Sequence, residues 1–482
     1  MQPQKLSGKS KFSYALGAVG KDMVYMLSAS YVLYYFQDLL GVKAYIMGII
    51  LLIARVFDAF NDPIMGVVVA KTKTRWGKFR PWLLIGTVTN AVILYFMFAA
   101  PPAMDAKGLV AYAAVFYILW GVTYTMMDIP YWSMIPAFTE GGKERENLTT
   151  LARTCAGVGS AIITIVTMKL VPMLGKAFAG DNAGAQMIEI VGFKYFAAIV
   201  GILFIVFIGL TCINVKEKST AEMKTTSVGQ MFKALIQNDQ AMTVTIAIVL
   251  INCAVYITSN LVIYFFKYDF GTTGWNDAYV LFNMFGGAIQ VLSMMLFYPL
   301  LRKKFSSLQI FYICIGMAVV GYLVLLGLSF TAMKSVYLLF VPAFFIFAAN
   351  GMLTVITTVF LANTVDYGEL KNHRRDESVI FSMQTFVVKL ASGIAALAAS
   401  ICLSINNLQS GTEVSEADAV TDFSVGVSAA AKTGLRMTMT IIPIAGLIVA
   451  FLWFKKKYVL TDSKVLEIAA EVKKLHAADE AK

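Results

Sequence analysis

Two carboxylates lie in a stretch that otherwise has the apolar composition of a membrane-spanning helix. Asp58 and Asp62 are four residues apart in the segment RVFDAFNDP, and Arg55 precedes the first by three residues. On a helix, residues at these spacings are neighbours about 5–6 Å apart on one face. Placing one carboxylate near the centre of a bilayer costs about 2.5–3.5 kcal/mol or more. The adjacent pair therefore predicts a site that receives a cation.

A second polar group predicts sugar binding. Tyr124, Asp128 and Trp132 follow one another at spacings of four, so on a helix they form one stripe. A carboxylate accepts hydrogen bonds from sugar hydroxyls, and the apolar face of a pyranose packs on an indole ring. Aromatic residues at helical spacing more often pack in a core, but the carboxylate between these two favours a sugar site.

Thr125, the residue after Tyr124, links this stripe to the carboxylate pair. Its hydroxyl could complete an oxygen shell with Asp58, Asp62 and Asn61 around a hard cation. We expect Na⁺ at Asp58, Asp62 and Thr125, with Li⁺ as an alternative ion. Proton coupling stays open as well, because it needs only one carboxylate whose pKa is raised by burial and by its neighbour.

Three more charged residues fall in predicted spans. Lys21 and Asp22 lie in the first span and Arg153 in the fifth. Lys21 is near enough to a membrane boundary to snorkel instead of binding a ligand, whereas the shorter Asp22 favours function. Arg153 could bind vicinal hydroxyls, or could form a structural ion pair with an aspartate of another helix.

The second half of the chain offers one polar stretch deep in a span. Gln384 and Thr385 are candidate sugar ligands, and Lys389 shares a helix face with Thr385. A buried lysine needs a carboxylate or a substrate, so we predict that Lys389 pairs with Asp58 and Asp62. Lys389 and Arg55 are the residues expected to take part in coupling.

Composition indicates the class of protein that holds these groups. The 482 residues are 58% hydrophobic and 14% charged, whereas about a quarter of a soluble chain is charged. At about 20 residues per crossing, the apolar stretches predict twelve membrane-spanning helices in a multi-pass, all-α protein of the lipid bilayer. These lie at 13–38, 44–70, 82–100, 109–137, 149–174, 190–213, 241–266, 277–300, 308–329, 335–362, 378–405 and 432–455.

The polar segment 214–240 divides the predicted spans six and six, a layout typical of transporters with two pseudo-symmetric halves. We expect an N-terminal six-helix bundle at 1–213, a cytoplasmic middle loop at 214–240, a C-terminal six-helix bundle at 241–456 and a cytoplasmic tail at 457–482 with a short amphipathic helix. Lys and Arg concentrate in alternate connections, which predicts that both termini are cytoplasmic, in a cell (inner) membrane. For the same reason the net charge of +11 does not indicate nucleic-acid binding.

The chain shows no pattern of an enzyme. His373 and His476 are its two histidines and both fall in predicted cytoplasmic segments, and the five cysteines are scattered without ligand spacing. There is no nucleophile–base set, zinc spacing or phosphate-binding glycine loop. We therefore predict no catalytic residue and no cofactor beyond the coupling ion, and a protein that functions as a monomer.

Six segments in order resemble the signatures of the glycoside-pentoside-hexuronide cation symporters. They are GAVGKD at 17–22, ARVFDAFNDPIMG at 54–66, RWGKFRPW at 75–82, YTMMDIPYWS at 124–133, NTVDYGE at 363–369 and QTFVVK at 384–389. The resemblance covers nearly the whole chain, and it implies a major facilitator fold and cation-coupled sugar uptake. It places Asp58, Asp62, Asn61 and Thr125 at the cation, Lys21, Asp22, Asp128, Trp132 and Arg153 at the sugar, and Lys389 between the two.

One departure leaves the substrate open. Thr354 stands where the family has a Trp in the tenth span, so the C-terminal wall of the pocket is expected to differ. A galactoside, another small oligosaccharide, a pentoside and a uronide all remain candidates. A cation-dependent lysolipid transporter on the same scaffold is a further alternative, against which the charged residues argue. A sensor would need a large cytosolic domain.

Overall fold

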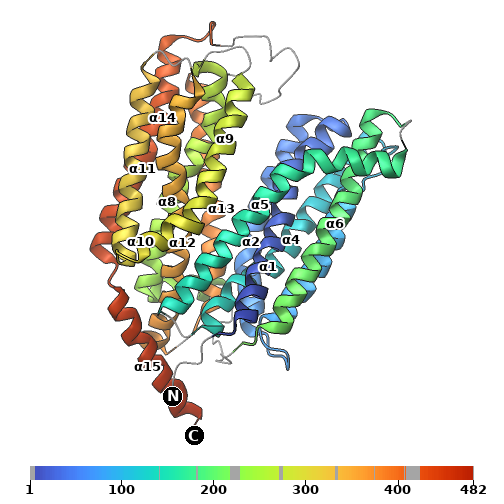
Figure 1. The fold of residues 1–482 in the computed structure, drawn as a ribbon. Coiled ribbons are helices and arrows are strands. Elements are labelled where there is room, and N and C mark those ends of the chain that lie inside the picture. The colour runs from blue at the N-terminus through green and yellow to red at the C-terminus, as the bar shows by residue number, and fades with distance from the viewer. Residues whose placement is uncertain are drawn as a thin grey trace. The chain divides into compact units, whose positions relative to one another are not determined.

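The protein is described by a computed structural model that covers residues 6–139, 142–180, 183–217, 228–270, 275–331, 335–373, 375–406, 408 and 424–480. The described residues form helices joined by short connections (Figure 1). The helices are α1 (Gly8–Tyr34), α2 (Ala44–Lys71), α3 (Arg80–Met97), α4 (Ala106–Phe138), α5 (Gly142–Ala179), α6 (Ala185–Asn214), α7 (Val228–Gln237), α8 (Asp239–Phe265), α9 (Trp275–Leu292), α10 (Tyr298–Arg302), α11 (Ser307–Ser329), α12 (Phe340–Asn372), α13 (Glu377–Ile405), α14 (Ala429–Lys457) and α15 (Asp462–Glu480).

Ten helical stretches in the described residues are long and apolar enough to cross a membrane. They comprise α3–α6, α8, α9 together with α10, and α11–α14. The sequence predicts twelve spans, and the two that are not among these ten are α1 and α2. These helices have 27 and 28 residues, which suffices for a crossing, but they carry the charged residues that the sequence singles out as functional.

Side-chain caps explain where several helices begin. Asp105 accepts from the backbone N–H of Gly108 at the start of α4. Ser306 and Gln309 form a reciprocal capping box at the start of α11. Such caps satisfy backbone donors that have no partner within the helix, so α4 and α11 begin where the sequence first offers a cap.

The chain forms two compact units. The first comprises Met1–Asn238, Leu361–Phe386 and Val465–Lys482, and the second comprises Asp239–Phe360 and Val387–Lys464. Both α12 and α13 therefore contribute residues to each unit. The predicted bundles at 1–213 and 241–456 stay a prediction.

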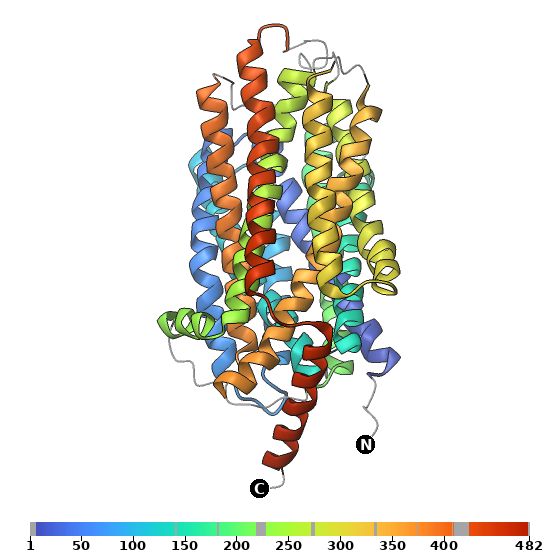
Figure 2. The same cartoon turned by 90° about the vertical axis from the view of Figure 1, so that its left-hand side faces the viewer.

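In the first unit, α1 packs against α5 and α6, and α4 packs against α2 and α3. Gly17 permits the close approach of α1 and α6, because a Cβ there would lie 2.5 Å from Thr211 Oγ1. In the second unit, α14 runs alongside α8 and α11 (Figure 2). The predicted site residues of the first half of the chain lie on α1, α2, α4 and α5 of the first unit.

The polar connections differ in part from the prediction. The predicted middle loop contains a short helix, α7, while its residues 218–227 lie outside the described residues. The amphipathic helix expected in the tail is present as α15.

Candidate functional site

A cluster of charges, which we call the Lys21 cluster, lies where α1 meets α4. Lys21 Nζ is 2.8 Å from Asp22 Oδ1 and 2.8 Å from Asp128 Oδ1, and it donates to the Tyr124 hydroxyl at 3.2 Å. Lys21 is only 4% exposed, so it does not snorkel. A cation held between two carboxylates offsets part of the desolvation cost of all three groups.

Trp132 and Arg153 adjoin this cluster. Trp132 Nε1 donates to Asp128 Oδ1 at 3.1 Å, and the guanidinium carbon of Arg153 lies 3.7 Å from the centroid of the Trp132 ring. A guanidinium stacked on an indole is a favourable cation–π contact. These two contacts fix the orientation of the indole beside the carboxylates. The structure therefore brings together the six residues predicted from the first half of the chain to bind sugar.

The second cluster, which we call the α2 cluster, lies where α2 meets α4. Asp62 is fully buried and accepts a hydrogen bond from Thr125 Oγ1 at 2.9 Å. Asp58, one helical turn earlier, lies against Gly121, where an added Cβ would overlap its carboxylate. Because Gly121 and Thr125 are also one turn apart, the two carboxylates meet α4 at two successive turns.

Two further residues of α2 border the carboxylate pair. Arg55 interacts electrostatically with Tyr25 and with Asp58. Asn61 is half-buried, and its Nδ2 has no hydrogen-bond partner among the described residues. Arg55 thus connects the surroundings of Asp58 to α1, which carries Lys21 and Asp22.

Helix α4 supplies side chains to both clusters from adjacent positions. Tyr124 and Asp128 face α1, whereas Gly121 and Thr125 face α2. Successive residues of a helix point about 100° apart. Helix α4 therefore contributes side chains to both clusters and connects them directly.

Three predicted residues lie on α13. Thr385 Oγ1 donates to the carbonyl oxygen of Phe381 at 3.1 Å, and Gln384 is half-buried in the first unit. Lys389 belongs to the second unit, and Asp58 and Asp62 belong to the first. The assignments of Gln384 and Thr385 to the sugar and of Lys389 to coupling stay predictions.

Sequence reasoning missed a locked aromatic pair beside the Lys21 cluster. Tyr14 and Tyr131 stack with ring centroids 4.4 Å apart. The Tyr14 hydroxyl donates to the carbonyl oxygen of Tyr131 at 2.5 Å, and the Tyr131 hydroxyl donates to that of Tyr14 at 2.6 Å. These contacts join α1 to α4 next to Trp132. Both residues fall in quoted motifs or just before one, but nothing in their spacing indicates the reciprocal bonds.

A buried ion network lies at one end of the first unit. Arg145 donates to Asp366 at 2.7 Å, and Arg375 contacts Asp366 at 3.0 Å and Glu369 at 2.5 Å. The sequence suggests a gate or a surface network at 366–375, but Asp366, Glu369 and Arg375 are buried; Arg374 lies outside the described residues. Burial opposes the charge on Arg375, yet the carboxylates of Glu377, Asp366 and Glu369 raise its pKa well above the ordinary value.

The same two arginines also satisfy the end of α4. Arg375 Nη2 donates to the carbonyl oxygen of Pro136 at 2.6 Å, and Arg145 Nη2 donates to that of Thr139 at 3.2 Å. The last carbonyls of a helix have no partner within it, and cations at a helix C-terminus are favourable. The network therefore secures the end of the helix that carries both candidate sites.

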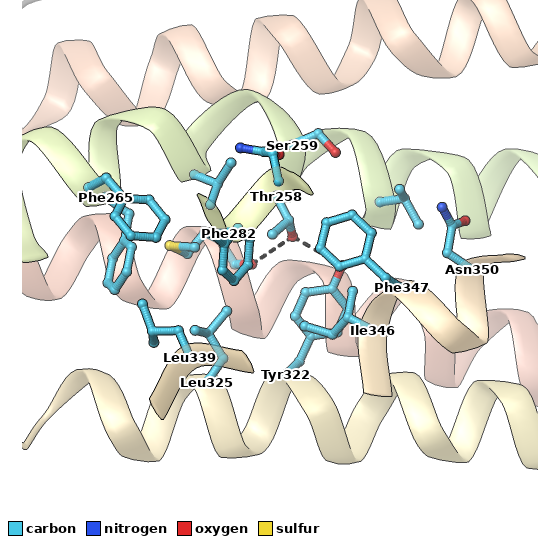
Figure 3. Close-up of a pocket in the computed structure, with 15 residues that line it drawn as sticks. Thr258, Ser259, Phe265, Phe282, Tyr322, Leu325, Leu339, Ile346, Phe347 and Asn350 are labelled. Atoms are coloured by element: carbon cyan, nitrogen blue, oxygen red, sulfur yellow. Dashed lines mark hydrogen bonds between the residues drawn. The ribbon is translucent and has the colours of Figure 1, made fainter. Parts of the chain in front are cut away.

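The second unit contains a cavity of about 70 Å³ (Figure 3). Its walls are mostly aromatic and aliphatic, with Thr258, Ser259, Asn283 and Asn350 as polar members. The Thr258 hydroxyl donates to the carbonyl oxygen of Met439 at 2.9 Å and lies 3.1 Å from the Tyr322 hydroxyl. Thr354, the position that departs from the family, bonds to the carbonyl oxygen of Asn350 at 2.8 Å. Sequence reasoning missed this cavity because no charged residue marks it.

Comparison with known proteins supplies a family and relatives. The pattern of the family described as "MFS/sugar transport protein" matches residues 13–462. A lactose permease of Lactobacillus delbrueckii subsp. bulgaricus is 28% identical over 475 residues, which cover 96% of this chain and 72% of that protein. A raffinose carrier protein of Pediococcus pentosaceus is 27% identical, with 96% and 71% covered. A putative glycoside/cation symporter of Escherichia coli is 26% identical, with 98% and 96% covered.

A solved structure shares the fold. The proton:xylose symporter bound to 6-bromo-6-deoxy-D-glucose, a major facilitator protein, has a TM-score of 0.64 and 16% sequence identity, covering 96% of this chain and 98% of that chain. This likeness confirms the predicted major facilitator fold.

Proposed function

Because this chain belongs to the MFS/sugar transport protein family, we propose that it is a cation-coupled symporter that imports a glycoside. The family and its relatives are transporters, which confirms the prediction that the chain is not an enzyme. The observation that carries the proposal is the pair of buried polar clusters on adjacent faces of α4.

The Lys21 cluster has the chemistry that sugar recognition needs. Asp22 and Asp128 accept hydrogen bonds from hydroxyls, Lys21 and Arg153 donate them, and Trp132 offers an apolar ring. Hydrogen bonds to charged groups are about twice as strong as neutral ones. An apolar lysolipid tail makes no favourable contact with four charged side chains, so the cluster supports a sugar over a lysolipid. The lactose, raffinose and glycoside relatives agree with this choice.

The α2 cluster supports sodium, lithium or proton coupling. Asp58 and Asp62 repel each other while both are ionised, and a bound cation or proton removes the repulsion. Thr125 supplies a third oxygen through its contact with Asp62. The glycoside/cation relative agrees with a cation as the co-substrate. Residues 1–138 would thus supply most of both sites, in a monomer whose termini are cytoplasmic in a cell (inner) membrane.

Coupling follows if the two clusters favour the same arrangement of α4. A cation that draws α2 against Thr125 also sets the position of Tyr124 and Asp128, since all three lie within five consecutive residues of α4. Thermodynamic linkage then requires that sugar raise the affinity for cation by the factor by which cation raises the affinity for sugar.

The test is uptake by proteoliposomes under sodium, lithium and proton gradients imposed separately. The panel comprises radiolabelled lactose, melibiose, raffinose, a methyl xyloside and a methyl glucuronide. We expect accumulation of one or more sugars above equilibrium under at least one gradient, and less accumulation at the same sugar concentration in Asp128→Asn. Failure to accumulate any sugar, with lysolipid uptake under the same gradients, would contradict the proposal.

A further inference from the structure

Four aromatic side chains lie together next to the Lys21 cluster. Tyr117, Trp120 and Tyr124 follow one another on α4, with ring centroids 5.8 Å and 5.3 Å apart and interplanar angles of 19° and 21°. Tyr25 of α1 completes the group, 5.5 Å from Tyr124 and 6.2 Å from Trp120. The group connects directly to Lys21 through the Tyr124 hydroxyl.

Tyr25 is the outer member of this group. It is 37% exposed, whereas Trp120 is 5% exposed and Tyr117 is 7% exposed. Tyr25 follows Asp22 by three residues and Lys21 by four, so it shares their face of α1. The Asp22 side chain is 20% exposed on that face. Because a charged carboxylate avoids lipid, the face opens onto a polar space, and the Tyr25 ring is available to a polar ligand there.

The aromatic group also contains polar atoms suited to a hydroxylated ligand. The Tyr25 hydroxyl interacts electrostatically with Arg55. Trp120 Nε1 is buried and has no hydrogen-bond partner among the described residues. Leaving a buried donor unsatisfied is unfavourable, so a hydroxyl that reached it would gain a hydrogen bond.

Aromatic side chains thus flank the charged centre in both directions along α4. Trp132 lies on one side of Asp128 and Tyr124 on the other, eight residues from Trp132, or about 12 Å along the helix. One pyranose packed on Trp132 and bonded to the carboxylates does not need this extent. A second ring, joined to the first, would reach the exposed face of Tyr25.

We propose that Tyr25, backed by Trp120 and Tyr124, is a second carbohydrate subsite that binds the glycosyl ring next to the one held at Asp128 and Trp132. The substrate class is then a glycoside of at least two rings. The inference rests on the proposed function, since the first ring must occupy the predicted sugar site.

The experiment is calorimetric binding to the full-length protein in nanodiscs, with pairs of sugars that share their first ring. The pairs are lactose with methyl β-D-galactoside, melibiose with methyl α-D-galactoside, and isoprimeverose with methyl α-D-xyloside. For the pair that the wild type binds, Tyr25→Ala should weaken the two-ring sugar about five- to tenfold, as expected for one lost aromatic contact. The one-ring sugar should change by less than about twofold.

Two variants separate the ring from its surroundings. Tyr25→Phe keeps the ring and removes the hydroxyl that interacts with Arg55, so it should retain the preference for two rings. Tyr31→Ala makes the same truncation on the same helix, next to Phe193, and should leave both affinities unchanged.

Equal losses for both sugars in Tyr25→Ala, or no loss for either, would overturn the second subsite while leaving the proposed function intact. If the wild type binds no sugar of any pair, both the proposed function and the inference are contradicted.

Discussion

Gly121 leaves the space in which the Asp58 carboxylate lies, so adding one methyl group there tests the predicted cation site. A Cβ at Gly121 would overlap Asp58 Oδ1 and lie 3.1 Å from Asp58 Cγ and 3.2 Å from Oδ2. Gly121→Ala must therefore displace the carboxylate from α4. Asp62 keeps its hydrogen bond with Thr125 one turn away, so the change affects one of the two carboxylates.

The expected magnitude comes from two opposing effects. Alanine is more favourable than glycine inside a helix by about 0.5–1 kcal/mol, so a weaker helix would not explain a loss. Mutating a residue that orients a metal ligand typically lowers the affinity for the metal about 10–100-fold. We expect the sodium concentration for half-maximal stimulation of sugar binding to rise by about tenfold or more. Sugar affinity without sodium should change by less than about twofold, because Asp128, which contacts Lys21, lies two turns, or roughly 10 Å, along α4 from Gly121.

The assay is calorimetric titration of sugar into purified protein at a series of sodium concentrations. The matched control is Gly48→Ala on α2, where an added Cβ meets nothing within 4 Å; it should bind sodium and sugar like the wild type. Unchanged sodium dependence in Gly121→Ala would refute the placement of the cation at Asp58. An equal loss of sugar affinity without sodium would show that the two clusters are not separate.

Substitutions at three further residues test the assignments. Asp62→Cys should retain sugar binding but lose its stimulation by sodium and uphill uptake; stimulation that persists in a binding titration would place the cation elsewhere. Asp128→Asn removes one of two carboxylates at Lys21 and should weaken sugar binding about tenfold, with sodium affinity unchanged when measured without sugar. Trp132→Ala should lose about 1 kcal/mol or more of sugar binding and Trp132→Phe only part of it; normal affinity in the alanine variant would make the indole a packing residue.

The predictable part of the site consists of charged residues that a membrane makes costly. Lys21, Asp22 and Asp128 stand out in apolar spans, and helical spacing alone puts Asp128 and Trp132 on one face. The structure places Lys21 between the two carboxylates at 2.8 Å. Spacing within one helix could not show this, because the contact depends on how α1 packs against α4.

The features that escaped sequence analysis depend on packing between segments distant in the chain. Tyr14 and Tyr131 are 117 residues apart, and Arg145 and Asp366 are 221 residues apart. Aromatic residues are common in any membrane helix, and an arginine near a predicted helix end gives no sign of burial. The burial of Asp366, Glu369 and Arg375 could not be predicted for this reason: the partner of Asp366 comes from the start of α5. Nothing in the sequence indicates a role for Gly121, because its importance comes from the Asp58 carboxylate that lies against it.

Two consecutive residues of α4 provide a direct route by which cation binding and sugar binding would be coupled. Tyr124 and Thr125 are consecutive, yet the first meets Lys21 at 3.2 Å and the second meets Asp62 at 2.9 Å. A rotation of α4 that improves one contact changes the other, since a helix turns as a unit. Arg55 adds a second connection, from the surroundings of Asp58 to Tyr25 on α1. If both ligands favour the same setting of α4, each strengthens the binding of the other by the same factor, and the coupling needs no chain of intermediate residues.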